Sequence, residues 1–267
     1  MALAVVALAA PAQAQQLVMV AAVPEINVTV VGGNDRSRDS RGTGFLVGRD
    51  TWVTAAHVVN GCATVYVKIA NEWRPASNVK LHGSADLAVF QARQDDRAKP
   101  LPLSTRSPVA GDVAVHVGFA KGEFTAVETR FSASANVRLA STGNVSAGWV
   151  WAHDQAGSEG RMNGLSGGPQ LDAGGAVQGV TVSYGNGSGG LRMTTMPISG
   201  LDGFLPATVQ QRRPSAGFEG FGTAASSAIQ ANQRYAMQLQ AVQLQASGSV
   251  ASVFCAATTS TRNLPRS

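Results

Sequence analysis

Short segments rich in β-forming residues, separated by turn-forming residues, restrict the fold of this chain more than any other feature. Between residues 26 and 205, Gly, Asn, Asp and Pro interrupt apolar runs of five to nine residues, and no helical periodicity lies between them. This pattern predicts an all-β sandwich or barrel. The expected strands are INVTVV (26–31), GFLVG (44–48), TVYVKI (64–69), DLAVFQ (86–91), DVAVHVG (112–118), GWVWAH (148–153), AVQGVTVSY (176–184) and LRMTTM (191–196).

The composition favours one compact domain with additional segments. Of the 267 residues 44% are apolar and 14% are charged, so the chain can bury a sizeable core. No apolar run reaches the roughly 18 residues that a membrane-spanning helix needs, and we expect no stable membrane insertion.

The N-terminus has the pattern of a secretory signal. A short apolar stretch is followed by Ala12-Gln13-Ala14, a small-residue cleavage pattern, so residues 1–14 are predicted to be removed and the protein to be secreted or periplasmic. A buried N-terminal helix is the alternative. In an oxidising compartment the two cysteines, Cys62 and Cys255, either form a disulfide across 193 residues or remain free thiols, and the sequence leaves both open.

Basic charge is concentrated in the C-terminal segment. Residues 206–267 hold five Arg and one Glu, a net charge of +4, which leaves +1 of the total +5 for residues 1–205. Because the main domain is nearly neutral and no basic run is interleaved with aromatic residues, nucleic-acid binding is not expected. The sequence also lacks metal-binding motifs, so we expect neither a metal nor another cofactor.

The pattern changes near Leu205. Residues 206–267 read as a linker followed by an Ala/Gln-rich stretch with apolar residues at Ile229, Tyr235, Leu239 and Val242, which indicates a partly helical tail. Either a docked helix or an unpacked polar tail fits this composition. We therefore expect a main domain over residues 15–205 and a separate tail.

Three short motifs could carry nucleophilic chemistry. His57 lies in TAAHV at the end of an apolar run, Asp86 directly precedes an apolar strand in ADLAVF, and Ser166 lies in the glycine-rich GLSGGP. A serine hydroxyl becomes nucleophilic when a base accepts its proton and a third group orients that base. Their order along an all-β chain resembles the trypsin-like (chymotrypsin-fold) serine proteases, and most closely the bacterial secreted HtrA-like branch.

The resemblance covers about residues 40–200. It implies two six-stranded antiparallel β-barrels, with His57 as general base, Asp86 as orienting acid and Ser166 as nucleophile. The stretch from Gly111 to Gly118 and the MPIS sequence at 196–199 also resemble the HtrA-like branch.

The resemblance further implies how substrate is held. The N–H groups of Gly164 and Ser166 would form the oxyanion hole. Ser183, Tyr184 and Gly185 would pair with the substrate backbone as an added strand, with Tyr184 as one wall of the pocket for the residue before the cut. The candidates for the bottom of that pocket, Glu159, Gly160 and Arg161, leave its preference open.

Two departures from the family pattern are informative. Leu165 precedes the nucleophile where digestive trypsin-like enzymes carry an Asp that pairs with a new N-terminus, so the VVGG sequence at 30–33 is expected to be an ordinary strand end. The tail is also too short for the PDZ domain that usually follows in HtrA-like proteins.

The sequence thus predicts a serine endopeptidase that acts on polypeptides through an acyl-enzyme. The alternatives are a non-catalytic peptide-binding protein whose cleft is blocked by the tail and, more weakly, an esterase on an α/β fold that uses the G-x-S-x-G pattern.

Overall fold

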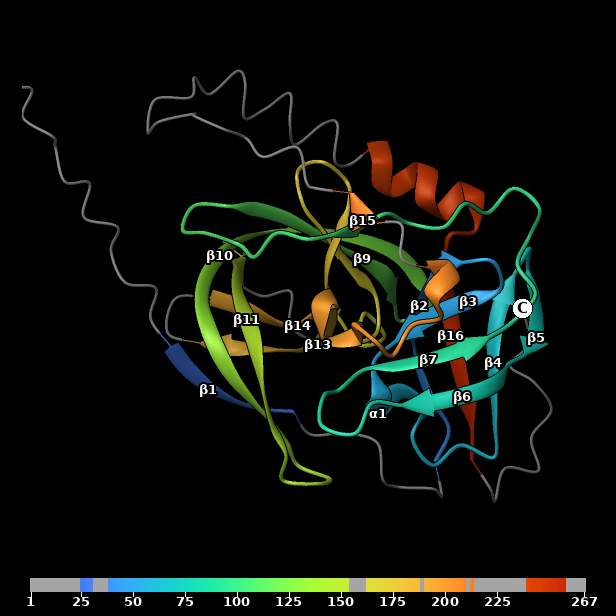
Figure 1. The fold of residues 1–267 in the computed structure, drawn as a ribbon, viewed down its shortest axis with the longest axis horizontal. Coiled ribbons are helices and arrows are strands. Elements are labelled where there is room, and N and C mark those ends of the chain that lie inside the picture. The colour runs from blue at the N-terminus through green and yellow to red at the C-terminus, as the bar shows by residue number, and fades with distance from the viewer. Residues whose placement is uncertain are drawn as a thin grey trace, which may run out of the picture.

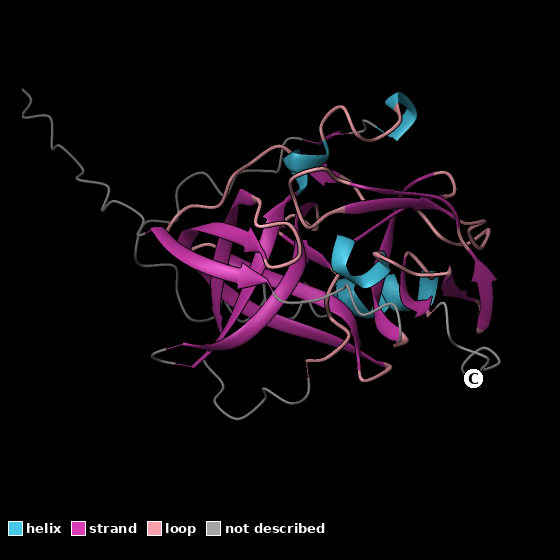
Figure 2. Ribbon diagram, turned by 90° about the horizontal axis from the view of Figure 1, so that it is seen from below, coloured by secondary structure: helices cyan, strands magenta, loops and turns pink. Residues whose placement is uncertain are grey.

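The described structure is built almost entirely of β-strands. The computed structural model describes residues 25–30, 38–153, 162–187, 190–209, 212–213 and 239–257. Within these ranges the strands form one sheet of nine and one of seven, which lie side by side (Figure 1). A second view shows that the helical segments are short beside the strands (Figure 2). The predicted all-β, trypsin-like double-barrel architecture is confirmed.

The first sheet holds the N-terminal half of the main domain and, unexpectedly, the C-terminal strand. Its order is β5-β4-β16-β2-β3-β7-β6. Its strands are β2 (Ser40–Gly48), β3 (Thr51–Thr54), β4 (Thr64–Ile69), β5 (Glu72–Pro75), β6 (Ser77–Leu81), β7 (Ala88–Gln91) and β16 (Val250–Ala256), with α1 (Ala56–Val59) between β3 and β4.

The second sheet closes into a six-stranded ring, because β12 pairs with both β9 and β13. The remaining strands extend it: β1 pairs with β10 in parallel, and β8 and β15 continue beyond β13. Its strands are β1 (Glu25–Val30), β8 (Leu103–Ser104), β9 (Val113–Ala120), β10 (Glu123–Leu139), β11 (Val145–His153), β12 (Pro169–Leu171), β13 (Val177–Gly187), β14 (Gly190–Pro197) and β15 (Arg212–Arg213); the 3₁₀ turns η2 (Ile198–Leu201) and η3 (Ala207–Val209) follow β14.

Each barrel is organised around a buried tryptophan. In the first, Trp52 stacks on Phe90 with ring centroids 6.3 Å apart, and its indole N–H donates to the carbonyl of Ala92. In the second, Trp151 packs edge-on against Phe131, and its N–H donates to the Thr195 hydroxyl. Satisfying the indole N–H lets these large rings be buried without an unpaired donor.

The C-terminal segment departs from the sequence-based expectation. The predicted division at residue 205 is wrong, because β16 is an interior strand that pairs with both β2 and β4. Residues 239–247 of the tail form a helix, as predicted, but the residues on its buried face are not the predicted ones. Leu239 and Val242 are exposed, while Ala241 and Leu244 are buried. Ile229 and Tyr235 lie outside the described residues.

A disulfide between Cys62 and Cys255 fastens β16 to the segment that follows α1, with the two Cα atoms 5.3 Å apart. Of the other sequence features, Val30 ends β1 as a buried residue, whereas residues 31–33 and the predicted signal lie outside the described residues. No helix in the described part of the chain has the length and apolar character needed to cross a membrane.

We predict that ending the chain at Leu205 abolishes cooperative folding, because β2 and β4 then lose the strand between them and their ladder hydrogen bonds. Circular dichroism and urea denaturation check this. As a matched control, replacing Cys62 and Cys255 together by Ser keeps the strand and should cost only about 2–4 kcal/mol in the free energy of unfolding. A truncated protein with a sharp, native-like unfolding transition would contradict the structural role of β16.

A buried histidine makes the second barrel sensitive to acid. His116 is fully buried in β9, and its two ring nitrogens contact the hydroxyls of Thr181 (2.8 Å) and Thr129 (3.1 Å). Burial, with a smaller contribution from His153, lowers the pKa of His116 to about 3. The unfolded chain therefore binds the extra proton between about pH 6.5 and pH 3, where the folded protein does not.

This difference should lower the free energy of unfolding by about 1.4 kcal/mol for each pH unit below about 6.5. His116→Gln removes the titrating group while keeping a hydrogen-bonding side chain, so its stability should fall less steeply with decreasing pH. Urea denaturation of both proteins between pH 4 and 7 measures the two slopes. Parallel stability curves would show that His116 does not titrate in this way.

Candidate active site

His57 and Asp86 are held together by the first barrel. His57 lies in the short helix α1 directly after β3, and Asp86 lies just before β7, the neighbour of β3 in the sheet. The Asp86 carboxylate accepts two hydrogen bonds from the same residue, one from the backbone N–H of His57 (2.8 Å) and one from its ring Nδ1 (2.6 Å). The imidazole is thereby fixed in both position and orientation.

The hydrogen bonds of this pair leave the second ring nitrogen of His57 available as a base. Asp86 is 1% exposed, whereas the His57 side chain is 18% exposed. A buried carboxylate is costly unless it is hydrogen-bonded, and here both of its oxygens are used. Because Nδ1 donates to Asp86, Nε2 is the ring nitrogen left to accept a proton.

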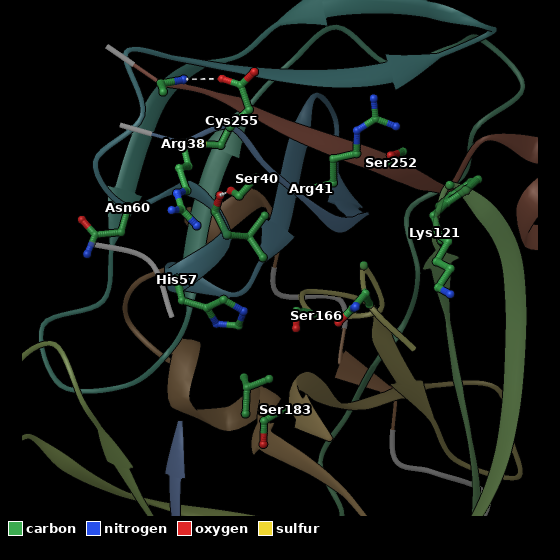
Figure 3. A pocket seen from close by; sticks show the side chains of 18 of the residues that line it. Arg38, Ser40, Arg41, His57, Asn60, Lys121, Ser166, Ser183, Ser252 and Cys255 are labelled. Carbon is green, nitrogen blue, oxygen red and sulfur yellow. Dashed lines mark hydrogen bonds between the residues drawn. The ribbon is translucent and has the colours of Figure 1, made fainter. Parts of the chain in front are cut away.

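Ser166 comes from the second barrel, in the turn between β11 and β12. The cleft that it shares with His57 has a volume of about 630 Å³ and lies where the two barrels meet. In the close view, the imidazole ring of His57 is directed toward Ser166 (Figure 3). The fold thus brings together the three predicted residues, which are separated by 29 and 80 positions in the sequence.

Glycines allow the Ser166 turn to pack tightly against both barrels. Gly164 and Gly167 have φ values of +105° and +88°, a region that side chains rarely adopt. A Cβ atom at Gly164 would lie 2.3 Å from the carbonyl oxygen of Phe119, and one at Gly167 would lie 2.1 Å from that of Thr43. Between them, Leu165 is fully buried in the core of the second barrel. The residue that departs from the digestive-enzyme pattern therefore anchors the turn by packing.

Three successive peptide groups of this turn are fixed by hydrogen bonds to their carbonyl oxygens. The carbonyl of Asn163 accepts from the N–H of Lys121 (2.7 Å), that of Gly164 from the Thr43 hydroxyl (2.7 Å), and that of Leu165 from the N–H of Gly168 (2.9 Å). In a trans peptide the N–H points opposite to the carbonyl. The N–H groups of Gly164 and Ser166 are therefore turned away from these partners.

Neither of these two N–H groups has a backbone acceptor in the described part of the chain. Both residues line the cleft. The two groups that the sequence nominated for the oxyanion hole are thus available donors beside the Ser166 hydroxyl.

Thr43 of β2 was not identified from the sequence. It is fully buried and contacts the Ser166 turn from the opposite barrel. Its hydroxyl donates to the carbonyl of Gly164 and accepts from the N–H of Phe119 (2.9 Å), while its own N–H donates to the carbonyl of Ser166 (2.8 Å). The available signal was the sequence Gly42-Thr43-Gly44, since glycines on both sides of one polar residue indicate close approach of another segment.

The predicted substrate residues are only partly brought to the cleft. Ser183 and Tyr184 of β13 line it, and the Tyr184 hydroxyl donates to the side-chain oxygen of Asn163. Gly185 follows them on β13 but is exposed and does not line the cleft. The candidates for the bottom of the pocket, residues 159–161, lie outside the described residues.

The disulfide lies at the edge of the same cleft, where Cys255 forms part of the lining. The described end of the tail, up to Ala257, thus forms a wall of the cleft as a strand of the first barrel. Among the described residues, no group of three or more His, Cys, Asp or Glu side chains is arranged to hold a metal ion.

Comparison with solved structures shows the same fold. The active form of the Rv3671c protease from Mycobacterium tuberculosis matches with a TM-score of 0.54 at 19% identity, over 78% of this chain and 96% of that chain. An inactive form of that protease with a serine-to-alanine substitution matches with a TM-score of 0.52 at 21% identity, over 68% and 94% of the two chains. The HtrA-type protease AlgW with a decapeptide also matches, with a TM-score of 0.47 at 20% identity, over 59% and 48%.

Comparison with curated protein sequences gives no significant match. The family comparison is decisive, because residues 42–180, just over half of the chain, match the trypsin-like peptidase domain. With two barrels, and with His57 and Ser166 lining the cleft between them, this chain belongs to the trypsin-like peptidase family.

Proposed function

We propose that this protein is a serine endopeptidase that cleaves polypeptides through an acyl-enzyme intermediate on Ser166. The observation that carries the proposal is the double hydrogen bond from His57 to the buried carboxylate of Asp86, in a cleft shared with Ser166. This arrangement supplies a base of fixed orientation next to a hydroxyl. Family membership supplies the reaction class, hydrolysis of peptide bonds.

Each proton transfer follows from this geometry. Nε2 of His57 accepts the proton as Ser166 Oγ bonds to the substrate carbonyl carbon, and Asp86 stabilises the imidazolium that forms. The carbonyl oxygen gains negative charge and accepts hydrogen bonds from the N–H groups of Gly164 and Ser166. His57 then gives its proton to the leaving amine as the peptide bond breaks, and water hydrolyses the acyl-enzyme by the same route.

The substrate peptide would bind in the cleft as an added strand beside Ser183 and Tyr184 of β13. Both residues line the cleft on the β13 side, so the peptide residues before the cut would lie there and present their carbonyl to Ser166. We further propose an exported, oxidising location, which the predicted signal at 1–14 and the Cys62–Cys255 disulfide support.

The two alternatives have less support. The esterase hypothesis required helices between the strands, and the described fold is all-β. The blocked-cleft hypothesis required the disulfide-bonded tail to lie across the site, whereas residues 250–257 contribute a wall of the cleft.

Treatment with an organophosphonate that modifies activated serines tests the proposal directly. We expect the purified protein to gain the mass of one adduct, because the reagent needs both a nucleophilic Ser166 and an oxyanion hole. Ser166→Ala should gain none, and only the unsubstituted protein should digest casein. A well-folded protein that forms no adduct would contradict the proposal and favour the peptide-binding alternative.

Thr43 offers a second prediction. Thr43→Val keeps the shape of the side chain and the hydrogen bond from its N–H to Ser166, but removes the hydroxyl that binds the carbonyl of Gly164 and the N–H of Phe119. This carbonyl belongs to the peptide group between the two that carry the Gly164 and Ser166 N–H groups. Loss of one oxyanion donor costs about 10²- to 10³-fold in kcat, so loosening the peptide between the two donors should cost about 10- to 100-fold. Because these donors act mainly in the transition state, kcat should fall while KM changes little.

Thr43→Ser is the matched control, since it restores the hydroxyl and should retain kcat within about threefold. Steady-state kinetics on one peptide substrate, with urea denaturation of each variant, separate an effect on catalysis from an effect on stability. Equal losses of kcat in both variants, or none in Thr43→Val, would show that the hydroxyl does not position the site.

A further inference from the structure

The cleft is electrostatically divided at Ser166. On the β13 side its lining residues Asn163, Val182, Ser183 and Tyr184 carry no formal charge. Away from β13 the lining includes Arg38, Arg41 and Lys121; in the close view Arg38 and Arg41 lie across Ser166 from Ser183, and Lys121 lies to one side of Ser166 (Figure 3). Among the described residues that line the cleft, Asp39 is the single carboxylate, and it accepts a hydrogen bond from the N–H of Ala257 (2.9 Å).

Two of these cations are held in place by the fold. Arg41 lies on β2, and its guanidinium lies over the ring of Phe254, its partner on β16, 5.9 Å from the ring centroid. Lys121 lies at the turn between β9 and β10, where its N–H donates to the carbonyl of Asn163. The backbone of Lys121 is therefore fixed directly beside the Ser166 turn.

Neither Arg41 nor Lys121 forms an ion pair within the described residues. Ion pairs do occur elsewhere, as between Arg97 and Asp95 and between Arg106 and Asp112. Both residues are exposed and line the cleft, so a ligand bound there can reach their charges. This is an arrangement that a negatively charged ligand can satisfy.

The direction of the substrate decides which of its residues meet these cations. If the proposed function holds, the peptide before the cut lies along β13 and its carbonyl carbon lies at Ser166. The segment after the cut then crosses to the opposite side. An extended peptide advances about 3.3 Å per residue, so its first three residues span about 10 Å of this surface.

We propose that the enzyme selects substrates with acidic side chains in the first three positions after the cleaved bond, through Arg41 and Lys121. This inference rests on the proposed function and adds a substrate class to it. Beyond Arg41 the surface continues into a second hollow, which holds both Lys68 and Glu123, so the selection is confined to the positions nearest the cut.

The expected preference is moderate and sensitive to salt. Exposed ion pairs are weak, so each acidic residue should raise kcat/KM about two- to fivefold at low ionic strength. The gain should shrink in 0.5 M NaCl, where charges are screened within a few ångströms. It should appear in the acylation half of the reaction, because the segment after the cut has departed before the acyl-enzyme is hydrolysed.

A proteome-derived peptide library tests this preference over many peptide sequences at once. The protein digests the library, and mass spectrometry of the products identifies the residues on both sides of each cut. We expect Asp and Glu to be enriched in the three positions after the cut. The best-cleaved sequence is then synthesised with its acidic residue retained, or replaced by the matching amide or by Lys, and kcat/KM is measured for each peptide.

The double variant Arg41→Gln, Lys121→Gln should bring the ratio of kcat/KM between the acidic and amide peptides close to one. Lys80→Gln is the control, because it also replaces a positive charge by an amide, but on β6 and away from the cleft. This variant should have the same ratio of kcat/KM between the acidic and amide peptides as the unsubstituted protein. A preference that survives in the double variant, or one that Lys80→Gln lowers equally, would overturn the inference.

The phosphonate reagent separates this inference from the proposed function. A protein that forms the Ser166 adduct and cuts the library without enrichment of acidic residues overturns the acidic preference alone. A protein that forms no adduct and cuts nothing overturns both.

Discussion

The site depends on a contact between the two barrels, in which Thr43 of the first barrel binds the Ser166 turn of the second. The Thr43 hydroxyl and N–H make hydrogen bonds to the carbonyls of Gly164 and Ser166. The same residue also accepts from Phe119, which lies on β9 next to the turn that carries Lys121. In the digestive relatives an ion pair formed after cleavage has a corresponding role, whereas here Leu165 is buried in the core. Core packing and the buried Thr43 thus fix the peptide groups next to the proposed oxyanion donors without a charged partner.

The strands that could be predicted are those whose apolar residues are close together in the sequence. All eight predicted segments coincide with strands, but the long β10 was missed although its side chains alternate regularly between buried and partly exposed positions. Its buried positions include Thr129, Ala133 and Ala135, which are too small or polar to stand out in a hydrophobicity pattern. Similarly, β16 is a short apolar run within an Ala/Gln-rich segment, and only its tertiary pairing with β2 and β4 reveals it.

The site residues that could be predicted are likewise those with a local signal in the sequence. His57, Asp86 and Ser166 lie in short motifs whose neighbouring small or glycine residues are visible in the sequence. Thr43 was missed because its function lies in contacts with residues more than 70 positions away. Arg41 and Lys121 are 80 positions apart and form no basic run, so their common surface exists only after the barrels pack. Local motifs therefore identify the candidate reacting groups, whereas only the fold brings Thr43 to the Ser166 turn and Arg41 and Lys121 to one cleft.

The place of β16 in the chain has a consequence for biosynthesis. A ribosome makes β2 and β4 early, yet the strand that lies between them follows every strand of the second barrel. The first sheet consequently cannot join β4 to β2 until the second barrel has been synthesised, although domains generally fold in order of synthesis. His57 on α1 and Ser166 of the second barrel thus acquire their final geometry late and together. A nascent chain of this topology carries no finished catalytic site while it is still being made.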